Sequence, residues 1–203
     1  MHVRLNLITA DPLRLSDSVK FMESEVRLGI ESQPGNLGMS LQMNPELGVV
    51  ILESFWASGD ALRASERAVA PNRAEAVRRA TGTVTVERYR VPVFEKEASL
   101  RSGEGVRLTR MDVAAPAVED AVAAFGDTAV PQLAETDGFC SALMFVDRTS
   151  GHSIIETLWR DQEALAASRS AAAAIRVDTV AATSAVIRAV EEYRLIFSSV
   201  RKP

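Results

Sequence analysis

A pattern of nine residues occurs twice in this chain of 203 residues, and it constrains the fold more than any other feature. The first copy runs from Gly48 to Trp56 and the second from Gly151 to Trp159, which places the copies 103 positions apart. Each copy has a glycine, an apolar run, a glutamate and a final tryptophan. The same register extends without a gap from about residue 3 to residue 67. Chance does not preserve a register through several loops, so the chain is a tandem duplication.

Both copies have the same predicted order of elements, β-α-β-β-α-β. Apolar residues at spacings of three and four predict an amphipathic helix before the repeated pattern, and an alanine-rich helix follows it. The last strands match at an offset of 104, because one residue is inserted in the second copy. The predicted strands are 3–9, 38–43, 48–56 and 83–94 in the first copy, and 106–113, 140–146, 151–159 and 186–197 in the second.

Two prolines are expected to interrupt helices, because proline lacks a backbone donor and its ring clashes with the preceding turn. Pro71 predicts a break near residue 70 in the alanine-rich helix of the first copy. Pro131, which stands where the first copy has Leu28, predicts a kink or split in the earlier helix of the second copy.

This order of elements predicts an α+β fold made of two ferredoxin-like repeats. Each repeat should form a four-stranded antiparallel sheet with both helices on one face. The apolar residues of Val49–Trp56 do not alternate, so the strand should be buried on both faces. The second face most simply packs against the sheet of the other repeat, which gives an intramolecular barrel. The expected boundaries are residues 1–94, a charged linker at 95–105, and residues 106–203.

Composition argues against several classes of partner. The net charge is −4 and the basic residues are scattered among acids, which disfavours nucleic acid binding. The single cysteine, Cys140, allows no internal disulfide and no CxxC metal site, as expected for a protein of the reducing cytoplasm. The chain begins with an alternating pattern rather than a signal peptide, and no apolar run approaches the length of a membrane span.

Three features together resemble a known family. A Pro-Gly turn follows the first helix at Pro34-Gly35, a Glu-x-x-Trp motif ends the third strand, and a Ser or Asp cap begins an Ala-Leu helix. In this combination each repeat looks like the antibiotic biosynthesis monooxygenase family, of the dimeric α+β barrel superfamily. The resemblance implies a fused tandem of two such units. Its relatives include cofactor-independent oxygenases of quinol-like aromatics, haem-degrading enzymes, and proteins without an assigned activity.

The chain departs from this family where the family often has a histidine, nine residues after the aromatic residue of the third strand. The corresponding residues are Ser65 and Ser168. Haem-degrading relatives pair an asparagine of the first strand with a helical histidine. Asn6 is present, but its counterpart is Thr109 and neither copy has the histidine. The resemblance therefore disfavours haem degradation, and we expect no cofactor.

The repeated tryptophans and glutamates each have two interpretations. Trp56 and Trp159 either wall a pocket for a planar substrate or are core residues at a strand end. Glu53 and Glu156 lie within apolar runs, where desolvation would raise the pKa of a carboxylate and suit it to act as a general base. Alternatively, the glutamates pair with arginines of the last strand, such as Arg88 or Arg90.

Other polar residues have similar alternatives. The amide of Asn6 could hold a phenolate or enolate oxygen, or it could bind backbone at a strand end. Tyr89 and Tyr193 occupy equivalent positions, where a hydroxyl could reach a ligand or simply be half-buried in the sheet. His152 has no nearby ligating residues, so we expect no metal site.

The leading functional hypothesis is a cofactor-independent oxygenase acting on a small aromatic or polyketide-like compound. Asn6, Trp56 and Tyr89 would line one pocket, and Thr109, Trp159 and Tyr193 the second, with Glu53, Glu156, Ser65 and Ser168 as further substrate contacts. The alternative is a non-catalytic binding or structural protein of the same fold. Because the fusion supplies its own partner repeat, the chain is expected to be a pseudo-dimeric monomer or a homo-oligomer of it.

Overall fold

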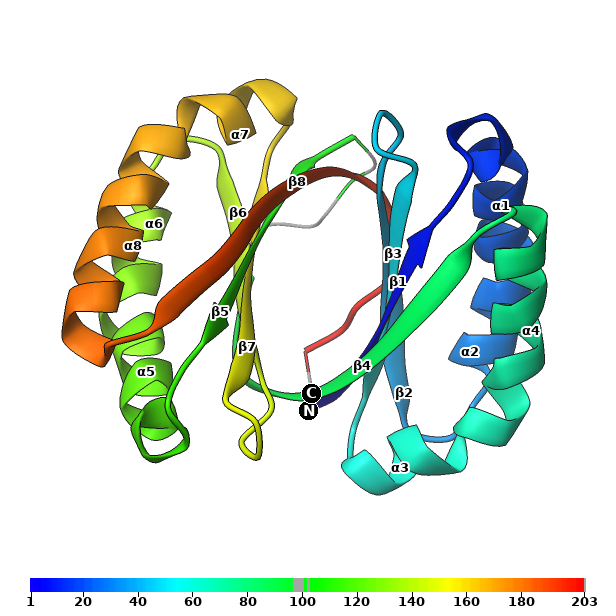
Figure 1. Ribbon diagram of the computed structural model, residues 1–203, viewed down its shortest axis with the longest axis horizontal. Helices are drawn as coiled ribbons and strands as arrows, with labels where there is room; N and C mark the ends of the chain where they lie inside the picture. The colour runs from blue at the N-terminus through cyan, green and yellow to red at the C-terminus, as the bar shows by residue number, and fades with distance from the viewer. Residues whose placement is uncertain (97–100, 102, 203) are drawn as a thin grey trace. The chain divides into compact units, whose positions relative to one another are not determined.

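The computed structural model describes residues 1–96, 101 and 103–202 (Figure 1). The chain divides into two compact units, which we call unit 1 (Met1–Tyr89 and Leu195–Pro203) and unit 2 (Arg90–Arg194). The last strand of each repeat therefore begins in one unit and ends in the other. Part of the linker predicted at 95–105, residues 97–100 and 102, lies outside the described residues.

Unit 1 contains the first β-α-β-β-α-β repeat. Its elements are β1 (His2–Thr9), a 3-10 turn (Pro12–Arg14), α1 (Leu15–Phe21), a π turn (Met22–Val26), α2 (Arg27–Glu31), β2 (Asn36–Asn44), β3 (Val49–Trp56), α3 (Gly59–Ala64), α4 (Glu66–Arg79) and the start of β4 (Thr83–Lys96).

Unit 2 repeats this order. Its elements are β5 (Gly105–Asp112), a 3-10 turn (Ala115–Ala117), α5 (Val118–Ala124), a π turn (Phe125–Ala129), α6 (Val130–Ala134), β6 (Phe139–Val146), β7 (His152–Trp159), α7 (Gln162–Ala167), α8 (Arg169–Thr183) and most of β8 (Val186–Ser198).

The strands pair as an antiparallel sheet with the hydrogen-bonded order β1-β3-β2-β8-β5-β7-β6-β4, which closes as a barrel. The predicted α+β fold of two ferredoxin-like repeats is confirmed. Register sets which side chains share a face: Asn6 pairs with Leu52, whereas Leu5 pairs with Glu53. In unit 2, Thr109 pairs with Ile155 by the same rule.

The repeated strand is buried on both faces, as its unbroken apolar run predicts. Leu52 and Trp56 belong to the cluster that packs under the helices of unit 1. Ile51 and Phe55 alternate with them on the opposite face and are 0% and 1% exposed. A shift of one residue in the pairing of this strand would exchange its side chains between the two faces, so it would disturb the packing on both.

The break predicted near residue 70 is wrong, because α4 continues through Pro71. Pro71 and Arg67, whose carbonyl loses its helical donor, are both exposed, so water can satisfy that carbonyl. The helix changes direction earlier, at Ser65 between α3 and α4. In the second copy, Pro131 lies just after a π turn. Because the first copy has the same π turn without a proline, the turn does not require it.

Gly151 precedes the repeated strand of unit 2 with a φ of +78°, and a Cβ there would lie 1.9 Å from the carbonyl oxygen of Val113. The Val113 N–H donates to the Gly151 carbonyl at 3.0 Å, so neither residue can move away without losing that bond. Gly151→Ala should therefore lower the free energy of unfolding by about 2–4 kcal/mol, from left-handed strain plus overpacking.

Urea unfolding followed by circular dichroism measures this loss. Gly103→Ala is the matched control, because Gly103 has a φ of +96° and a Cβ added there would meet no atom of the described residues within 4 Å. It should cost only the backbone strain, about 1 kcal/mol. Equal losses in the two variants would contradict the proposed clash.

Candidate functional site

Each unit has a pocket between its sheet and its helices, and the two pockets are built from equivalent positions. Every residue that lines the unit 1 pocket has its counterpart, 103 positions later, in the lining of the unit 2 pocket. The pairs include Arg4 with Arg107, and Asn6 with Thr109. The duplication has therefore preserved a pocket as well as a fold.

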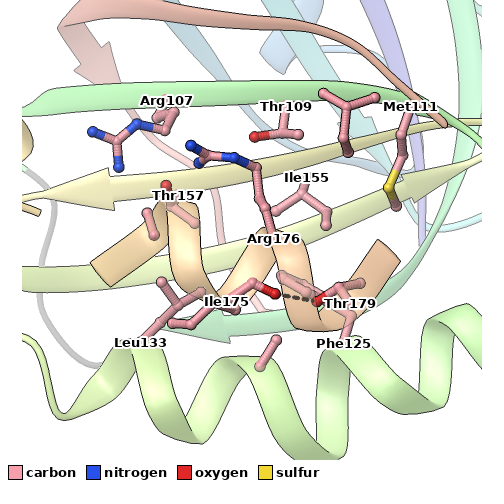
Figure 2. Close-up of a pocket in the computed structure, with 13 residues that line it drawn as sticks. Arg107, Thr109, Met111, Phe125, Leu133, Ile155, Thr157, Ile175, Arg176 and Thr179 are labelled. Atoms are coloured by element: carbon pink, nitrogen blue, oxygen red, sulfur yellow. Dashed lines mark hydrogen bonds between the residues drawn. The ribbon is translucent and has the colours of Figure 1, made fainter. Parts of the chain in front are cut away.

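Both pockets are narrow as they stand. The space open to a water-sized probe is about 20 Å³ in unit 1 and about 30 Å³ in unit 2, which is room for one or two water molecules. A larger ligand therefore requires side chains of the lining to move. Figure 2 shows that the guanidinium groups of Arg107 and Arg176 lie toward one end of the unit 2 pocket, and Met111 toward the other.

A π turn forms part of each pocket wall. Met22 and Val26 begin and end the turn in unit 1, and Phe125 and Ala129 do so in unit 2. A π turn inserts one extra residue into a helix and is frequent at functional sites. The apolar spacing of the sequence agrees with a regular helix, so the sequence did not reveal this turn.

A buried arginine anchors the polar end of each pocket. Arg4 is 1% exposed, and its Nη2 donates to the Leu62 carbonyl at 2.6 Å and to the Ser65 hydroxyl at 3.1 Å. These acceptors lie at the end of α3, where helical carbonyls have no helical donor. Ser65, at the position where the resembled family often has histidine, thus holds an arginine in place.

Unit 2 has the same anchor. Arg107 is 2% exposed and donates to the Leu165 carbonyl at 2.7 Å and to the Ser168 hydroxyl at 2.9 Å. The serines Ser65 and Ser168 therefore contact the protein's own guanidinium groups in both units.

The tryptophans lie beside these arginines. The guanidinium carbon of Arg4 is 5.5 Å from the ring centre of Trp56, and that of Arg107 is 5.9 Å from Trp159. Each indole N–H donates at 3.1 Å to a neighbour on its own strand, Ser54 or Thr157. Both tryptophans are fully buried and neither is part of the pocket lining. Each therefore packs beside a buried arginine rather than against a ligand.

The carboxylate that pairs with the buried arginine comes from a different element in each unit. In unit 1 it is Glu66, at the start of α4, whose oxygens lie 3.1 Å from Arg4 and 3.4 Å from Arg88 of β4. Arg73 also contacts Glu66. In unit 2 it is Glu192 of β8, which lies 2.9 Å from Arg107 and 2.5 Å from Arg169 of α8.

Comparison of the two copies shows that the charges are exchanged. Glu66 corresponds to Arg169, and Arg88 corresponds to Glu192. The helix carries the acid and the strand the base in unit 1, and the reverse holds in unit 2. The total charge of this pair is conserved, but the side from which the arginine receives its counter-charge is not.

This exchange leaves polar atoms without partners in unit 1. In unit 2 the Arg107 Nε donates to Glu192 at 3.2 Å. In unit 1, the Arg4 Nε and Nη1 and the Arg73 Nη1 have no hydrogen-bond partner among the described residues. The same is true of the Asn6 Oδ1, although the Asn6 Nδ2 donates to the Leu52 carbonyl at 3.1 Å. Burial, opposed by Glu66, lowers the pKa of Arg4 to about 10.

The remaining predicted residues lie away from the pockets. Glu53 and Glu156 pair in register with Leu5 and Leu108, on the face of the sheet opposite to Asn6 and Thr109. Arg88, predicted as a partner of Glu53, contacts Glu66. The structure therefore does not bring the glutamates of the repeated strand together with the pocket residues.

The tyrosines are also outside the pocket linings. Tyr193 pairs in register with Val106, so it lies on the face opposite to Arg107 and Thr109. Its hydroxyl donates to Glu191 at 3.2 Å, and burial raises its pKa. Tyr89 is buried on β4. Of the sets expected to share a pocket, the structure brings only Asn6 and Thr109 to the pocket surfaces.

Sequence reasoning missed the arginines Arg4, Arg107, Arg73 and Arg176. A signal was present, because both copies retain an arginine at an apolar strand and another in the long helix at the same offset. An arginine that persists in two diverged copies of an apolar segment points to a buried role.

No group of three or more His, Cys, Asp or Glu side chains able to hold a metal ion occurs within residues 1–96, 101 and 103–202. His152 contacts Asp112 at 2.7 Å on the surface. In the same part of the chain, every helix is too short or too polar to cross a membrane.

The chain has sequence relatives in Mycobacterium tuberculosis. It is 26% identical over 180 residues to the uncharacterized protein Rv2557, a match that covers 89% of this chain and 80% of the relative. It is also 26% identical over 204 residues to the uncharacterized protein Rv2558, a match that covers 100% and 86%. No protein-family model matches the chain.

Solved structures with the same fold include proteins related to monooxygenases. A Lactobacillus acidophilus protein with a provisional monooxygenase name has a TM-score of 0.70 and 12% identity, covering 98% of this chain and 94% of its own. An anthrone oxidase-like protein has a TM-score of 0.69 and 16% identity, covering 97% and 92%. A Listeria monocytogenes ferredoxin-fold protein related to antibiotic biosynthesis monooxygenases has a TM-score of 0.54 and 12% identity, covering 96% and 95%. The predicted monooxygenase-like fold is confirmed.

Removal of Arg107 should be far more damaging than removal of Arg169, although both pair with Glu192. Arg107→Leu leaves Ser168, the Leu165 carbonyl and Glu192 without their buried donor, and should lower the free energy of unfolding by about 3–5 kcal/mol. Arg169→Ala removes an exposed partner and should leave the urea midpoint nearly unchanged. Similar midpoints for both variants would contradict the anchoring role.

Stability should fall in acid because the arginines hold the pKa of Glu66 and of Glu192 below 4.5 in the folded state. A carboxyl with a lowered folded pKa stabilises the fold above its unfolded pKa, and this contribution is lost as the pH falls below about 4.5. The difference in urea midpoint between wild type and Glu192→Gln should therefore be largest at pH 7 and shrink toward pH 3. A difference independent of pH would show that Glu192 is not ionised in the fold.

Proposed function

We propose that this protein is a cofactor-independent oxygenase that acts on a small phenolic or enolic aromatic compound in the pocket of unit 1. The observation that carries this proposal is the buried Asn6 Oδ1, unpartnered among the described residues, in a pocket that also holds unpartnered arginine donors. The amide oxygen of Asn6 would accept a hydrogen bond from the substrate hydroxyl. The guanidinium groups would stabilise the oxyanion that forms when the proton leaves. The monooxygenase-like fold supports this assignment by analogy.

The substrate itself would supply the electrons. In the reaction of an anthrone-type compound, the activated carbon loses two hydrogen atoms and gains one oxygen atom of O₂ as a carbonyl. The second oxygen atom leaves as water, which balances the reaction without an added reductant. The apolar walls, including Met22, Val26 and Leu52, would exclude water from the reactive anion.

Deprotonation would depend on the acidity of the bound substrate. Among the described residues, the lining of the unit 1 pocket contains neither a histidine nor a carboxylate, and paired arginines lower the pKa of the nearby Glu66. The positive charges of Arg4 and Arg73 would lower the pKa of a substrate hydroxyl, by one unit for about each 1.4 kcal/mol of stabilisation of the anion. The proton would then leave to solvent.

A second candidate function, ligand binding without turnover, is favoured in unit 2. Thr109 replaces Asn6 there, and Arg107 is saturated by Ser168, the Leu165 carbonyl and Glu192. Arg176 reaches the same pocket, and burial together with the charge of Arg107 lowers its pKa. This pocket could hold a compound at its mouth but has fewer groups to stabilise a reacting oxyanion.

Oxygen consumption by the metal-free protein with a panel of anthrone-type compounds tests the proposal. Asn6→Leu removes the acceptor that holds the substrate hydroxyl and should reduce kcat/KM by about 10-fold, the usual cost of one lost hydrogen bond. Thr109→Val, the equivalent change in unit 2, should leave the rate within about two-fold. Absence of oxygen-dependent turnover across the panel would refute the proposal, and equal losses in the two variants would refute the assignment to unit 1.

A further inference from the structure

Around the unit 1 pocket, the described residues supply more positive than negative charge. Arg4, Arg73 and Arg88 share one carboxylate, that of Glu66. Arg4 is 1% exposed, and two of its nitrogens have no hydrogen-bond partner among the described residues. A buried cation with unused donors is costly, so the fold would gain stability from an anion that occupies this position.

In unit 2, a carboxylate of the protein itself occupies the position that this anion would take in unit 1. There, Glu192 accepts from the Nε and the Nη2 of Arg107, at 3.2 Å and 2.9 Å. The equivalent position in unit 1 is Arg88, whose charge acts against that of Arg4. Unit 1 therefore has an arginine in place of the carboxylate that completes the ion pair in unit 2, and Arg4 lines its pocket.

We propose that the unit 1 pocket binds a small amphipathic carboxylate whose hydroxyl group is too far from its own carboxylate to donate to it, such as a meta-hydroxylated aromatic acid. This inference rests on the proposed function in taking that pocket as the ligand site, and it names the class of the ligand. The carboxylate accepts from Arg4 and Arg73, and the hydroxyl donates to the Asn6 Oδ1. The apolar body packs against Ile8, Met22 and Leu52.

The number of unpartnered atoms among the described residues defines this ligand. Among the residues that line the pocket, the unpartnered donor atoms are two on Arg4 and one on Arg73, and the unpartnered acceptor is the Asn6 Oδ1. A carboxylate presents two acceptor oxygens, and a hydroxyl presents one acceptor and one donor, so the two groups together match the four protein atoms. A neutral phenol would leave a buried guanidinium partly unsatisfied, and a plain carboxylate would leave the amide oxygen unsatisfied.

Isothermal titration calorimetry with 3-hydroxybenzoate under nitrogen tests the site without any turnover. Because charge-assisted hydrogen bonds are the strong ones, 3-hydroxybenzoate should bind about 10–100-fold more tightly than its methyl ester. It should bind about 5-fold more tightly than benzoate, since benzoate lacks the hydroxyl. Equal affinities for the acid and the ester would overturn the proposal.

Arg88→Glu is the most informative variant, because it supplies unit 1 with a carboxylate at the position of Glu192. The side chain of Arg88 is 49% exposed, so the exchange should be tolerated. The new carboxylate should compete with the ligand for Arg4, which raises the melting temperature of the free protein and lowers the affinity for 3-hydroxybenzoate by about 10-fold or more. A general loss of folding would lower both quantities, so the opposite directions identify the competition.

Two further variants separate the pocket arginine from the charge of the helix. Arg73→Gln removes a pocket donor and should weaken binding by about 10-fold. Arg78→Gln removes the same charge from α4 at an exposed position paired with Glu75, and should leave binding unchanged. Equal losses in both variants would show that only the overall charge attracts the anion, and would overturn the site.

A failure of the carboxylate site can be distinguished from a failure of the proposed function. Tighter binding of the hydroxy acid than of its ester and of benzoate, without oxygen consumption with any compound, supports the carboxylate site and refutes the oxygenase. Turnover of neutral anthrone-type compounds, with no preference for the acid over the ester in binding, supports the oxygenase and refutes the carboxylate site.

Discussion

The local structure of both repeats depends on one buried charge, the arginine that projects from the first strand of each unit. A guanidinium out of water is stable only where acceptors and an opposite charge surround it. Arg4 and Arg107 obtain acceptors from the ends of α3 and α7, at the point where the helix changes direction. The tryptophan that ends the repeated strand packs beside the same group. The break between the helices, the serine at that break and the tryptophan are therefore parts of one arrangement around a cation.

The exchange of charge between a helix and a strand gives the two pockets different chemistry. A carboxylate on the strand, Glu192, lies in register with Arg107 and reaches its Nε edge. A carboxylate on the helix, Glu66, reaches only the Nη2 of Arg4. The first arrangement gives the buried arginine its counter-charge and its acceptors within the protein. The second leaves two donor atoms of Arg4, which lines a pocket, without partners among the described residues. Two substitutions that conserve the total charge can thus convert a structural ion pair into a candidate binding group, at a cost in stability that a ligand would offset.

The fold was predictable because it depends on periodicity, and the site was not because it depends on contacts between distant residues. The apolar run of the repeated strand predicts burial on both faces, and its duplication predicts the second sheet. Asn6 was identified because a polar residue among apolar neighbours of a strand is conspicuous. Arg4 is equally conspicuous, but a strand arginine is usually interpreted as solvent-exposed, and its acceptor at Ser65 lies 61 positions away. The prediction of a break at Pro71 was wrong, because α4 continues through this residue. Water can replace the backbone hydrogen bond that the proline removes, since the residue of the affected carbonyl is exposed.

The equivalence of the two pocket linings bears on how the two copies diverged and on how their affinities can be compared. Every lining position of unit 1 has its partner at a constant offset, and the inserted residue falls outside that set. Divergence has thus altered the functional groups while leaving the framework that carries them in register. One molecule contains two versions of a single cavity at equal concentration, in the same buffer and at the same temperature. The occupancies of a ligand that binds to both pockets give the ratio of the two affinities directly. Each pocket is therefore a control for the effect of the residues that differ between the two copies.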